Sequence, residues 1–348
     1  MRVAPVLRGR GMAFLCGALL VALLHGVMQQ QQQPSATPAP IVASATPVDA
    51  YELPSEEEAR ARTAHVADAA LRARCIGVLT GKLERFTSQY GQDAFVFANF
   101  VARRGLHAAG VYLDLGANDP IRISNTAFFD ICLGWRGVCV EPNPAYAEAF
   151  AQKRTCRLVP HCLSLTNFER VGFNFQDGVM GHVDSNSREN ATCFTLEHVL
   201  RTNADILGAP DERGALGSAL NYVSFDVEGA EGPLIACTDL FALFSSRPAW
   251  QAWTVETLYL AAAPYRAVDA AMALAGYAKH TALFRDDGTF HDDVYVMRRP
   301  RPRVPAHMQC ANGSNSCSLA RVMKAHRPGS KRLGAMPILC PGAPVRDN

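Results

Sequence analysis

The chain has almost no excess charge, since 34 basic and 32 acidic side chains leave a formal net charge of +2. This balance gives no reason to expect a nucleic-acid partner. The eleven cysteines contain no paired C-x-x-C sets, so their spacing does not predict a zinc ribbon. Either several cysteines are buried as small apolar side chains, or some pair as disulfides in a secretory compartment.

The N-terminus has the pattern of a membrane anchor. Arginines within the first ten residues precede an uncharged apolar run over residues 11–28. As a helix this run extends about 27 Å, close to the hydrocarbon thickness of a thin bilayer. Because the positive flank stays cytosolic and no cleavage site follows closely, we expect a single-pass type II anchor with the rest of the chain in the Golgi or endoplasmic reticulum lumen. A cleaved signal peptide and an organellar transit peptide remain alternatives, since the first acidic residue is Asp49.

Composition divides the remaining chain into three parts. Residues 29–85 contain a stem rich in Gln, Pro, Ala and Thr and then a linker helix, which we expect to run from a capping box at Ser55 to about Arg74. Residues 86–298 carry the pattern of a folded domain. Residues 299–348 form a tail rich in Pro and Arg with little core-forming pattern.

The domain alternates short apolar runs with amphipathic stretches, which predicts an α/β fold with a largely parallel sheet. We expect buried strands at 111–115, 137–140, 157–160, 221–226 and 251–257. We expect helices at 125–133, 145–154, 195–200 and 265–275. The last two apolar runs, 278–284 and 293–297, flank a turn signal and predict an antiparallel hairpin at a sheet edge. The polar region 167–192 predicts an insertion or a hairpin around 171–175.

A nucleoside-binding pattern begins in the strand at 111–115. Asp114 lies near the end of this strand, and Gly116 lets the backbone turn tightly beside a ligand. Glu141 ends the next strand, where a carboxylate can accept hydrogen bonds from both hydroxyls of a ribose. The residues after Asn118 do not complete a G-x-G-x-x-G motif. Because a pyrophosphate requires those glycines, the pattern favours S-adenosylmethionine over a dinucleotide, and a turn without any ligand is the alternative.

Three carboxylates follow the strand at 221–226, namely Asp226, Glu228 and Glu231. Crowding them together costs free energy unless they share a function. Asp226 or Glu228 could act as a general base for a hydroxyl group, and the others could hold a cation or orient an acceptor. The alternative is a helix N-terminus whose acids interact with the helix dipole. We assign no metal ligands from the sequence.

Together these motifs resemble the FkbM-type methyltransferase family, in particular a eukaryotic, membrane-anchored branch. The resemblance extends from Ser88 to Met297 and is most specific in the segment Phe-Asp-Val-Glu-Gly-Ala-Glu at 225–231. It implies a class I methyltransferase, Rossmann-like fold with a mostly parallel seven-stranded sheet and an antiparallel edge hairpin. It also implies S-adenosylmethionine as donor and a hydroxyl oxygen of a sugar or polyketide as acceptor.

The resemblance also implies residue roles. The cofactor's methionine end would lie on Asp114, Gly116 and Asn118. Its ribose would lie on Glu141, and its adenine would be flanked by residues 161–164, which include Cys162 and Ser164. This chain departs from the family at positions 119–120, where many members keep a second glycine.

We therefore expect an O-methyltransferase that passes a methyl group in line from a sulfonium to a hydroxyl, with Asp226 or Glu228 accepting the proton. The luminal anchor and stem favour a sugar or glycan acceptor over a lipid or a small metabolite. Two other classes stay open. One is a non-catalytic, membrane-tethered interaction module with the same fold, and the other is a nicotinamide-dependent oxidoreductase, which the missing phosphate glycines disfavour.

Overall fold

The computed structural model describes residues 53–102, 109–176, 178–212, 214–244, 250–258, 260–284 and 290–297. The predicted anchor, almost all of the stem and the C-terminal tail lie outside these ranges. Within them, no helix combines the length and the apolar character needed to cross a membrane.

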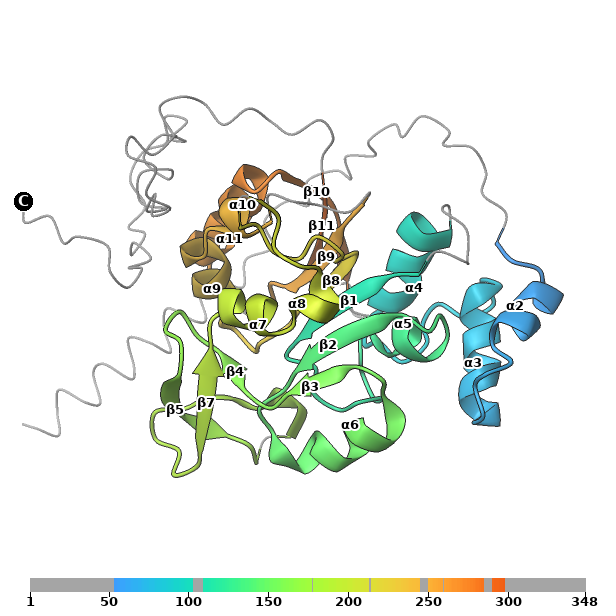
Figure 1. The fold of residues 1–348 in the computed structure, drawn as a ribbon, viewed down its shortest axis with the longest axis horizontal. Helices are drawn as coiled ribbons and strands as arrows, with labels where there is room; N and C mark the ends of the chain where they lie inside the picture. Colours follow the sequence, from blue (N-terminus) through green and yellow to red (C-terminus); the bar gives the residue numbers. More distant parts are fainter. Residues whose placement is uncertain are drawn as a thin grey trace, which may run out of the picture. The chain divides into compact units, whose positions relative to one another are not determined.

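A seven-stranded sheet forms the centre of the described domain (Figure 1). Its strands, in spatial order, are β10 (Tyr277–Phe284), β11 (Phe290–Met297), β9 (Ala252–Glu256), β8 (Tyr222–Phe225), β1 (Val111–Leu115), β2 (Arg136–Val140) and β3 (Arg157–Val159). All neighbours from β9 to β3 are parallel, whereas β11 is antiparallel to both β9 and β10. The predicted α/β class, mostly parallel sheet and edge hairpin are therefore confirmed. The architecture is compatible with a Rossmann-like fold.

Helices cover both faces of the sheet. One face packs on α7 (Leu196–Thr202), α8 (Ala204–Leu207), α9 (Glu231–Cys237), α10 (Leu240–Leu243) and α11 (Ala262–Leu274). The other face packs on α4 (Gln92–Val96), the π-helix η1 (Phe97–Val101), α5 (Ala127–Ile131) and α6 (Ala147–Lys153). Helices α2 (Glu56–Arg62) and α3 (Ala69–Leu79) lie to the side, beside α5 (Figure 1). Two short 3₁₀ turns, η3 (Pro144–Tyr146) and η4 (Gly178–Met180), complete the helical elements described.

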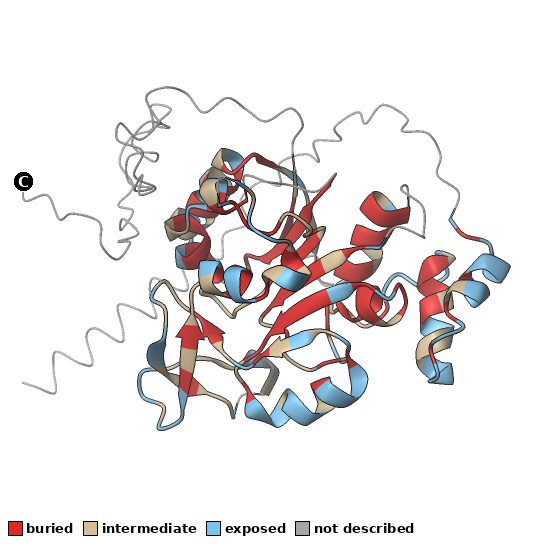
Figure 2. Cartoon of the chain, viewed as in Figure 1, coloured by how far each residue is buried: buried red, intermediate tan, exposed pale blue. Residues whose placement is uncertain are grey.

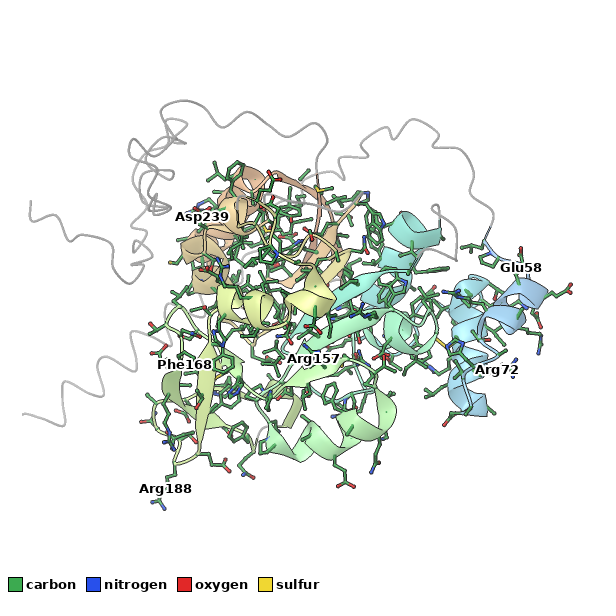
Figure 3. The ribbon with its side chains drawn as sticks, in the orientation of Figure 1. Glu58, Arg72, Arg157, Phe168, Arg188 and Asp239 are labelled. Carbon is green, nitrogen blue, oxygen red and sulfur yellow. A yellow bond between two sulfur atoms is a disulfide. The ribbon has the colours of Figure 1, made fainter. Side chains whose placement is uncertain are left out.

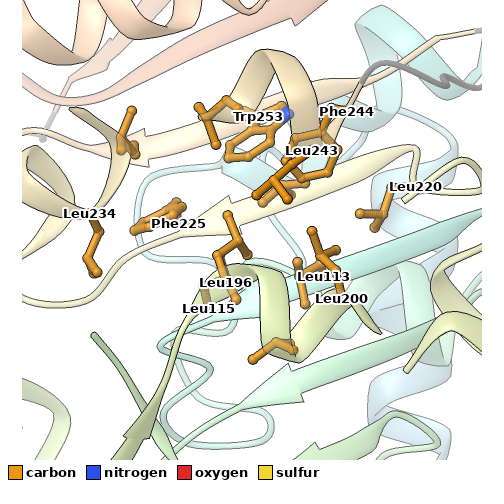
Figure 4. Packing of buried hydrophobic residues seen from close by; sticks show 14 of the residues in the cluster. Leu113, Leu115, Leu196, Leu200, Leu220, Phe225, Leu234, Leu243, Phe244 and Trp253 are labelled. Carbon is orange, nitrogen blue, oxygen red and sulfur yellow. The ribbon is translucent and has the colours of Figure 1, made fainter. Parts of the chain in front are cut away.

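The strands are buried on both faces, as Figure 2 shows. Side chains alternate across a strand, so Leu113 and Leu115 enter one core while Tyr112 between them enters the other. In the first core, Phe225 and Trp253 from neighbouring strands pack beside the two leucines (Figure 4). Burial on both faces explains why these strands read as continuous apolar runs.

The predicted insertion at 167–192 belongs to a second, four-stranded sheet. Its strands, in spatial order, are β4 (Cys162–Leu163), β7 (Asn190–Phe194), β5 (Glu169–Asn174) and β6 (His182–Val183). Strand β5 confirms the strand expected around 171–175. Its antiparallel pairing with β6 agrees with the expected hairpin, whereas β4 and β7 were not predicted from the sequence.

All seven cysteines in the described ranges are disulfide-bonded (Figure 3). The pairs are Cys75–Cys132, Cys139–Cys156 and Cys162–Cys193, and Cys237 is also bonded. The structure thus favours disulfides over buried free thiols. Cys156 and Cys162, which flank β3, bond with separate partners.

The predicted linker helix is two helices, α2 and α3. Ser55 and Glu58 form the expected capping box at the start of α2. Helix α2 ends at Arg62, and a second helix, α3, begins at Ala69. Asp68 caps α3 by accepting hydrogen bonds from the backbone N–H groups of Ala70 and Leu71. Helix α3 is joined to the segment after α5 by the Cys75–Cys132 disulfide, so it is covalently part of the domain.

Candidate functional site

A cavity of about 250 Å³ opens at the carboxyl ends of four adjacent parallel strands. Its lining includes Asp114 of β1, Val140 of β2 and Glu256 of β9, together with Asp226 directly after β8. Strand β1 lies between β2 and β8, so the strand order reverses beside it. Ligands of open parallel sheets bind in the crevice at such a reversal. The nucleoside-binding pattern and the acidic segment after β8, which the sequence analysis singled out separately, therefore face the same cavity.

The turn at Gly116 is shaped by the loop that follows β8. Gly116 has φ +80°, and a Cβ at this position would lie 1.6 Å from the carbonyl oxygen of Asp226. The Asp226 N–H donates to the carbonyl of Leu115 at 2.9 Å, and the Gly116 N–H donates to that of Val140 at 3.0 Å. Only glycine fits this conformation and this close approach.

Glu141 lies at the predicted position at the end of β2 and is held by the backbone. The N–H of Asn118 donates to its Oε2 at 2.9 Å, and the N–H of Asn143 donates to its Oε1 at 2.7 Å. Each carboxylate oxygen keeps a lone pair for a ligand hydroxyl. Burial raises the pKa of Glu141 to about 7. Asn118 supports this contact from a left-handed conformation with φ 54°.

Asp114 is buried at the cavity and connected to a polar network. The hydroxyl of Thr126 donates to its carboxylate at 2.5 Å, and the guanidinium of Arg154 donates to the same hydroxyl at 2.8 Å. Arg154 is paired with Asp130 at 2.7 Å, with both side chains fully buried. Burial raises the pKa of Asp114, while the positive charge of Arg154 acts in the opposite direction.

The predicted adenine segment lies only partly at the cavity. His161, Cys162 and Leu163 line it, and Cys162 contributes a disulfide rather than a thiol. Ser164 instead bonds within the small sheet. Its hydroxyl donates to Glu169, and its N–H donates to the carbonyl of Phe194 at 2.9 Å.

The acidic residues after β8 gather on the other side of the cavity. Burial and then the negative charge of Glu256 raise the pKa of Asp226 well above its usual range. Glu228 also lines the cavity, from a left-handed conformation with φ 57°, and burial raises its pKa. Glu231 begins α9, and one of its oxygens accepts the N–H of Val227 at 2.6 Å. Glu231 thus has the contact expected of an acid at a helix N-terminus, but its second oxygen, Oε2, is buried without a hydrogen-bond partner in the described residues.

Glu256, at the end of β9, lies at the cavity with an oxygen near those of Asp226 and Glu231. Ligand atoms from the three residues all lie within 4.8 Å of one another. Burial, followed by the charge of Glu231, raises the pKa of Glu256 to about 8.

Strand β11 brings two further residues that the sequence did not single out. Asp292 is paired in register with Glu256 across the antiparallel ladder. His291 places its Nε2 3.3 Å from Glu256 Oε1, and its Nδ1 contacts Asp292. The ring of Tyr90 packs on His291 with centroids 4.3 Å apart. The run His-Asp-Asp at 291–293 could have indicated these polar residues, but their place beside Glu256 depends on the pairing of β11 with β9, which is not local in the sequence.

Gln92 and Asp93, in the first turn of α4, are buried. The amide of Gln92 donates to Asp292 at 2.8 Å. Asp93 accepts the backbone N–H groups of Phe86, Thr87 and Ser88, each at 3.0 Å. Both residues therefore support the segment that carries Tyr90 to the cavity.

Comparison with known proteins adds no assignment: no family model matches the chain, and no curated protein matches it.

Proposed function

We propose that the chain is an S-adenosylmethionine-dependent O-methyltransferase of the FkbM type with a class I methyltransferase fold. The observation that carries the proposal is the shared cavity. On one side it has the Gly116 turn and the backbone-held carboxylate of Glu141, and on the other it has Asp226 and Glu228. The mostly parallel seven-stranded sheet with its antiparallel edge hairpin agrees with what the family resemblance implies.

The segment after β1 favours a cofactor without phosphate. Residues 117–126 form no helix, and α5 begins only at Ala127. Dinucleotide sites direct a helix N-terminus at the pyrophosphate immediately after the glycine turn. No such helix follows Gly116, which supports the methyl donor over a nicotinamide cofactor.

When bound, S-adenosylmethionine supplies a methyl group on a sulfonium, which is a good leaving group. Glu141 would hold its ribose hydroxyls, and the Gly116 turn would allow close approach of its methionine end. Asp226 or Glu228 would orient the acceptor hydroxyl and take its proton as the oxygen–carbon bond forms and the carbon–sulfur bond breaks. Positioning of the two reactants supplies most of the acceleration.

The disulfides support the proposed location. Seven paired cysteines within the described ranges suit an oxidising compartment and would not persist in a reducing cytosol. Together with the anchor pattern at 11–28, this supports a luminal, membrane-tethered enzyme. Glycans are abundant hydroxyl acceptors in such a lumen, so we propose a sugar hydroxyl as the methyl acceptor.

The proposal is tested by incubating the full-length protein with methyl-labelled S-adenosylmethionine and fractionated glycans, lipids and metabolites. We expect label to enter the glycan fraction as an ether and to be lost with Glu228→Gln. Cofactor binding without transfer to any fraction would favour the non-catalytic interaction module. Absence of cofactor binding in calorimetry would refute the proposal, and binding of a nicotinamide cofactor would favour the oxidoreductase.

A further inference from the structure

Three carboxylates from three different elements converge on the acidic side of the cavity. Asp226 follows β8, Glu231 begins α9 and Glu256 ends β9. One oxygen from each lies within 4.8 Å of the other two. Metal–oxygen distances of about 2.0–2.6 Å allow two ligands of one ion to lie up to about 4–5 Å apart. The spacing therefore fits a single small cation.

The same carboxylates carry buried oxygens that receive no hydrogen bond from an N–H group or a hydroxyl of the described residues. Glu231 is fully buried and Glu256 is only 5% exposed. Each uses its Oε1, toward the Val227 N–H and toward His291 respectively, while its Oε2 has no hydrogen-bond partner. Oδ1 of Asp226 is also without one. A buried, unsatisfied carboxylate oxygen is costly, so a further bound group is expected here.

Basic side chains of the described domain do not offset this negative charge. Its buried arginine, Arg154, pairs with Asp130, and Lys279 pairs with Asp269 and Asp293. Within the described residues, the basic side chain paired with one of the three carboxylates is that of His291, beside Glu256. Three close carboxylates with so little compensation are unfavourable without a cation or a shared proton.

We propose that Asp226, Glu231 and Glu256 form a binding site for one divalent cation, Mg²⁺ or Mn²⁺, on the acceptor side of the cavity. The donor set consists of carboxylate oxygens, which these hard cations prefer. Because Asp226 and Glu256 also line the cavity, the remaining coordination positions of the ion face open space. Water or ligand hydroxyls can occupy them.

The use of this ion in catalysis rests on the proposed function, whereas its binding does not. A hydroxyl bound to the cation is more acidic than a free one, and two neighbouring hydroxyls of a sugar can bind the same ion. With Asp226 on the metal, Glu228 is the carboxylate left to accept the proton. The substrate class is then a sugar with adjacent hydroxyls.

Binding is measured on the full-length protein after treatment with EDTA and dialysis. Mn²⁺ is added, free Mn²⁺ is followed by electron paramagnetic resonance, and thermal unfolding is recorded in parallel. We expect one saturable Mn²⁺ per chain, displaced by Mg²⁺, with a rise in melting temperature. Glu231→Gln and Glu256→Gln should each weaken Mn²⁺ binding by about tenfold or more, since each removes one ligand charge. Glu141→Gln is the matched control, because it makes the same change in the same cavity outside the three ligands and should bind Mn²⁺ like the wild type.

Both glutamine variants should fold, since each removes a crowded buried charge, and without metal they should melt no lower than the wild type. No Mn²⁺ bound by the wild type at millimolar concentration would overturn the site and indicate a shared proton. Equal binding by the wild type and both ligand variants would also overturn it. Binding that depends on the ligands, without methylation of any fraction, would keep the site and refute the proposed function. Full methyl transfer by the wild type in EDTA would refute the catalytic use of the ion.

Discussion

Lowering the pH should weaken cofactor binding through Glu141. Glu141 is 8% exposed, and burial raises its pKa to about 7. A ribose that donates two hydrogen bonds binds the ionised carboxylate better than the protonated one. Between pH 8 and pH 6 the ionised fraction falls from about nine-tenths to about one-tenth. Affinity for the cofactor should therefore fall about tenfold, equivalent to about 1.4 kcal/mol.

Calorimetric titration with S-adenosylhomocysteine at pH 6, 7 and 8 measures this change. Repeating the pH 7 titration in buffers of different ionisation enthalpy counts protons, and we expect about half a proton released per cofactor bound. Glu141→Gln is the control, because it should bind weakly at pH 8 and lack this component of the pH dependence. Any titration of the cofactor itself is common to both proteins and cancels in the comparison. A wild-type affinity that does not change with pH, or an equal slope in both proteins, would refute the ribose role.

The same group should affect stability in the opposite direction. Its folded-state pKa of about 7 lies above the ordinary value of 4.5, so the folded protein binds the proton more tightly than the unfolded chain. The contribution of Glu141 to the free energy of unfolding should thus fall as pH rises from 4.5 to about 7, by about 3 kcal/mol. The free energy of unfolding, measured with denaturant on the cofactor-free proteins, should depend differently on pH in the wild type and in Glu141→Gln only between pH 4.5 and about 7.

Three further changes test other parts of the site. Gly116→Ala should lower the free energy of unfolding by more than about 3 kcal/mol, because its Cβ would overlap the Asp226 carbonyl, and thermal melting measures this. Asp226→Ala should keep cofactor affinity in calorimetry but lower methyl transfer by about 10²-fold or more, and unchanged turnover would contradict its role. Replacing Cys162 and Cys193 together by serine should cost about 2–4 kcal/mol in denaturant unfolding, and an unchanged midpoint would mean that this disulfide does not stabilise the domain.

The sequence predicted the central sheet well because its strands are short, apolar and bounded by turn residues. The strand expected at 111–115 is β1 itself, and the other expected strands of this sheet match within a few residues. The small sheet was missed, since β4 and β6 have only two residues each. These short segments are strands because they pair with distant ones, as Cys162 pairs with Cys193, 31 residues later, and no local sequence pattern indicates such a pairing.

The site shows the same division between local and non-local information. Asp114, Glu141 and Asp226 could be predicted to meet because the carboxyl ends of parallel strands share one edge of a sheet. The position of His291 could not be predicted in this way, because it reaches the cavity on an antiparallel strand whose register with β9 is set by packing. Ser164 was expected beside adenine, but its hydrogen bonds lie within a sheet that the sequence did not predict.

The contact between Gly116 and Asp226 has a consequence for how such a protein can change. The proposed function assigns Gly116 to the donor side of the cavity and Asp226 to the acceptor side, yet their backbones are in direct contact, although 110 positions apart in the chain. An evolving or engineered variant that reshapes the loop after β8 to admit a new acceptor would therefore also displace the donor turn. Acceptor specificity should be easier to alter through side chains on this loop than through insertions in it.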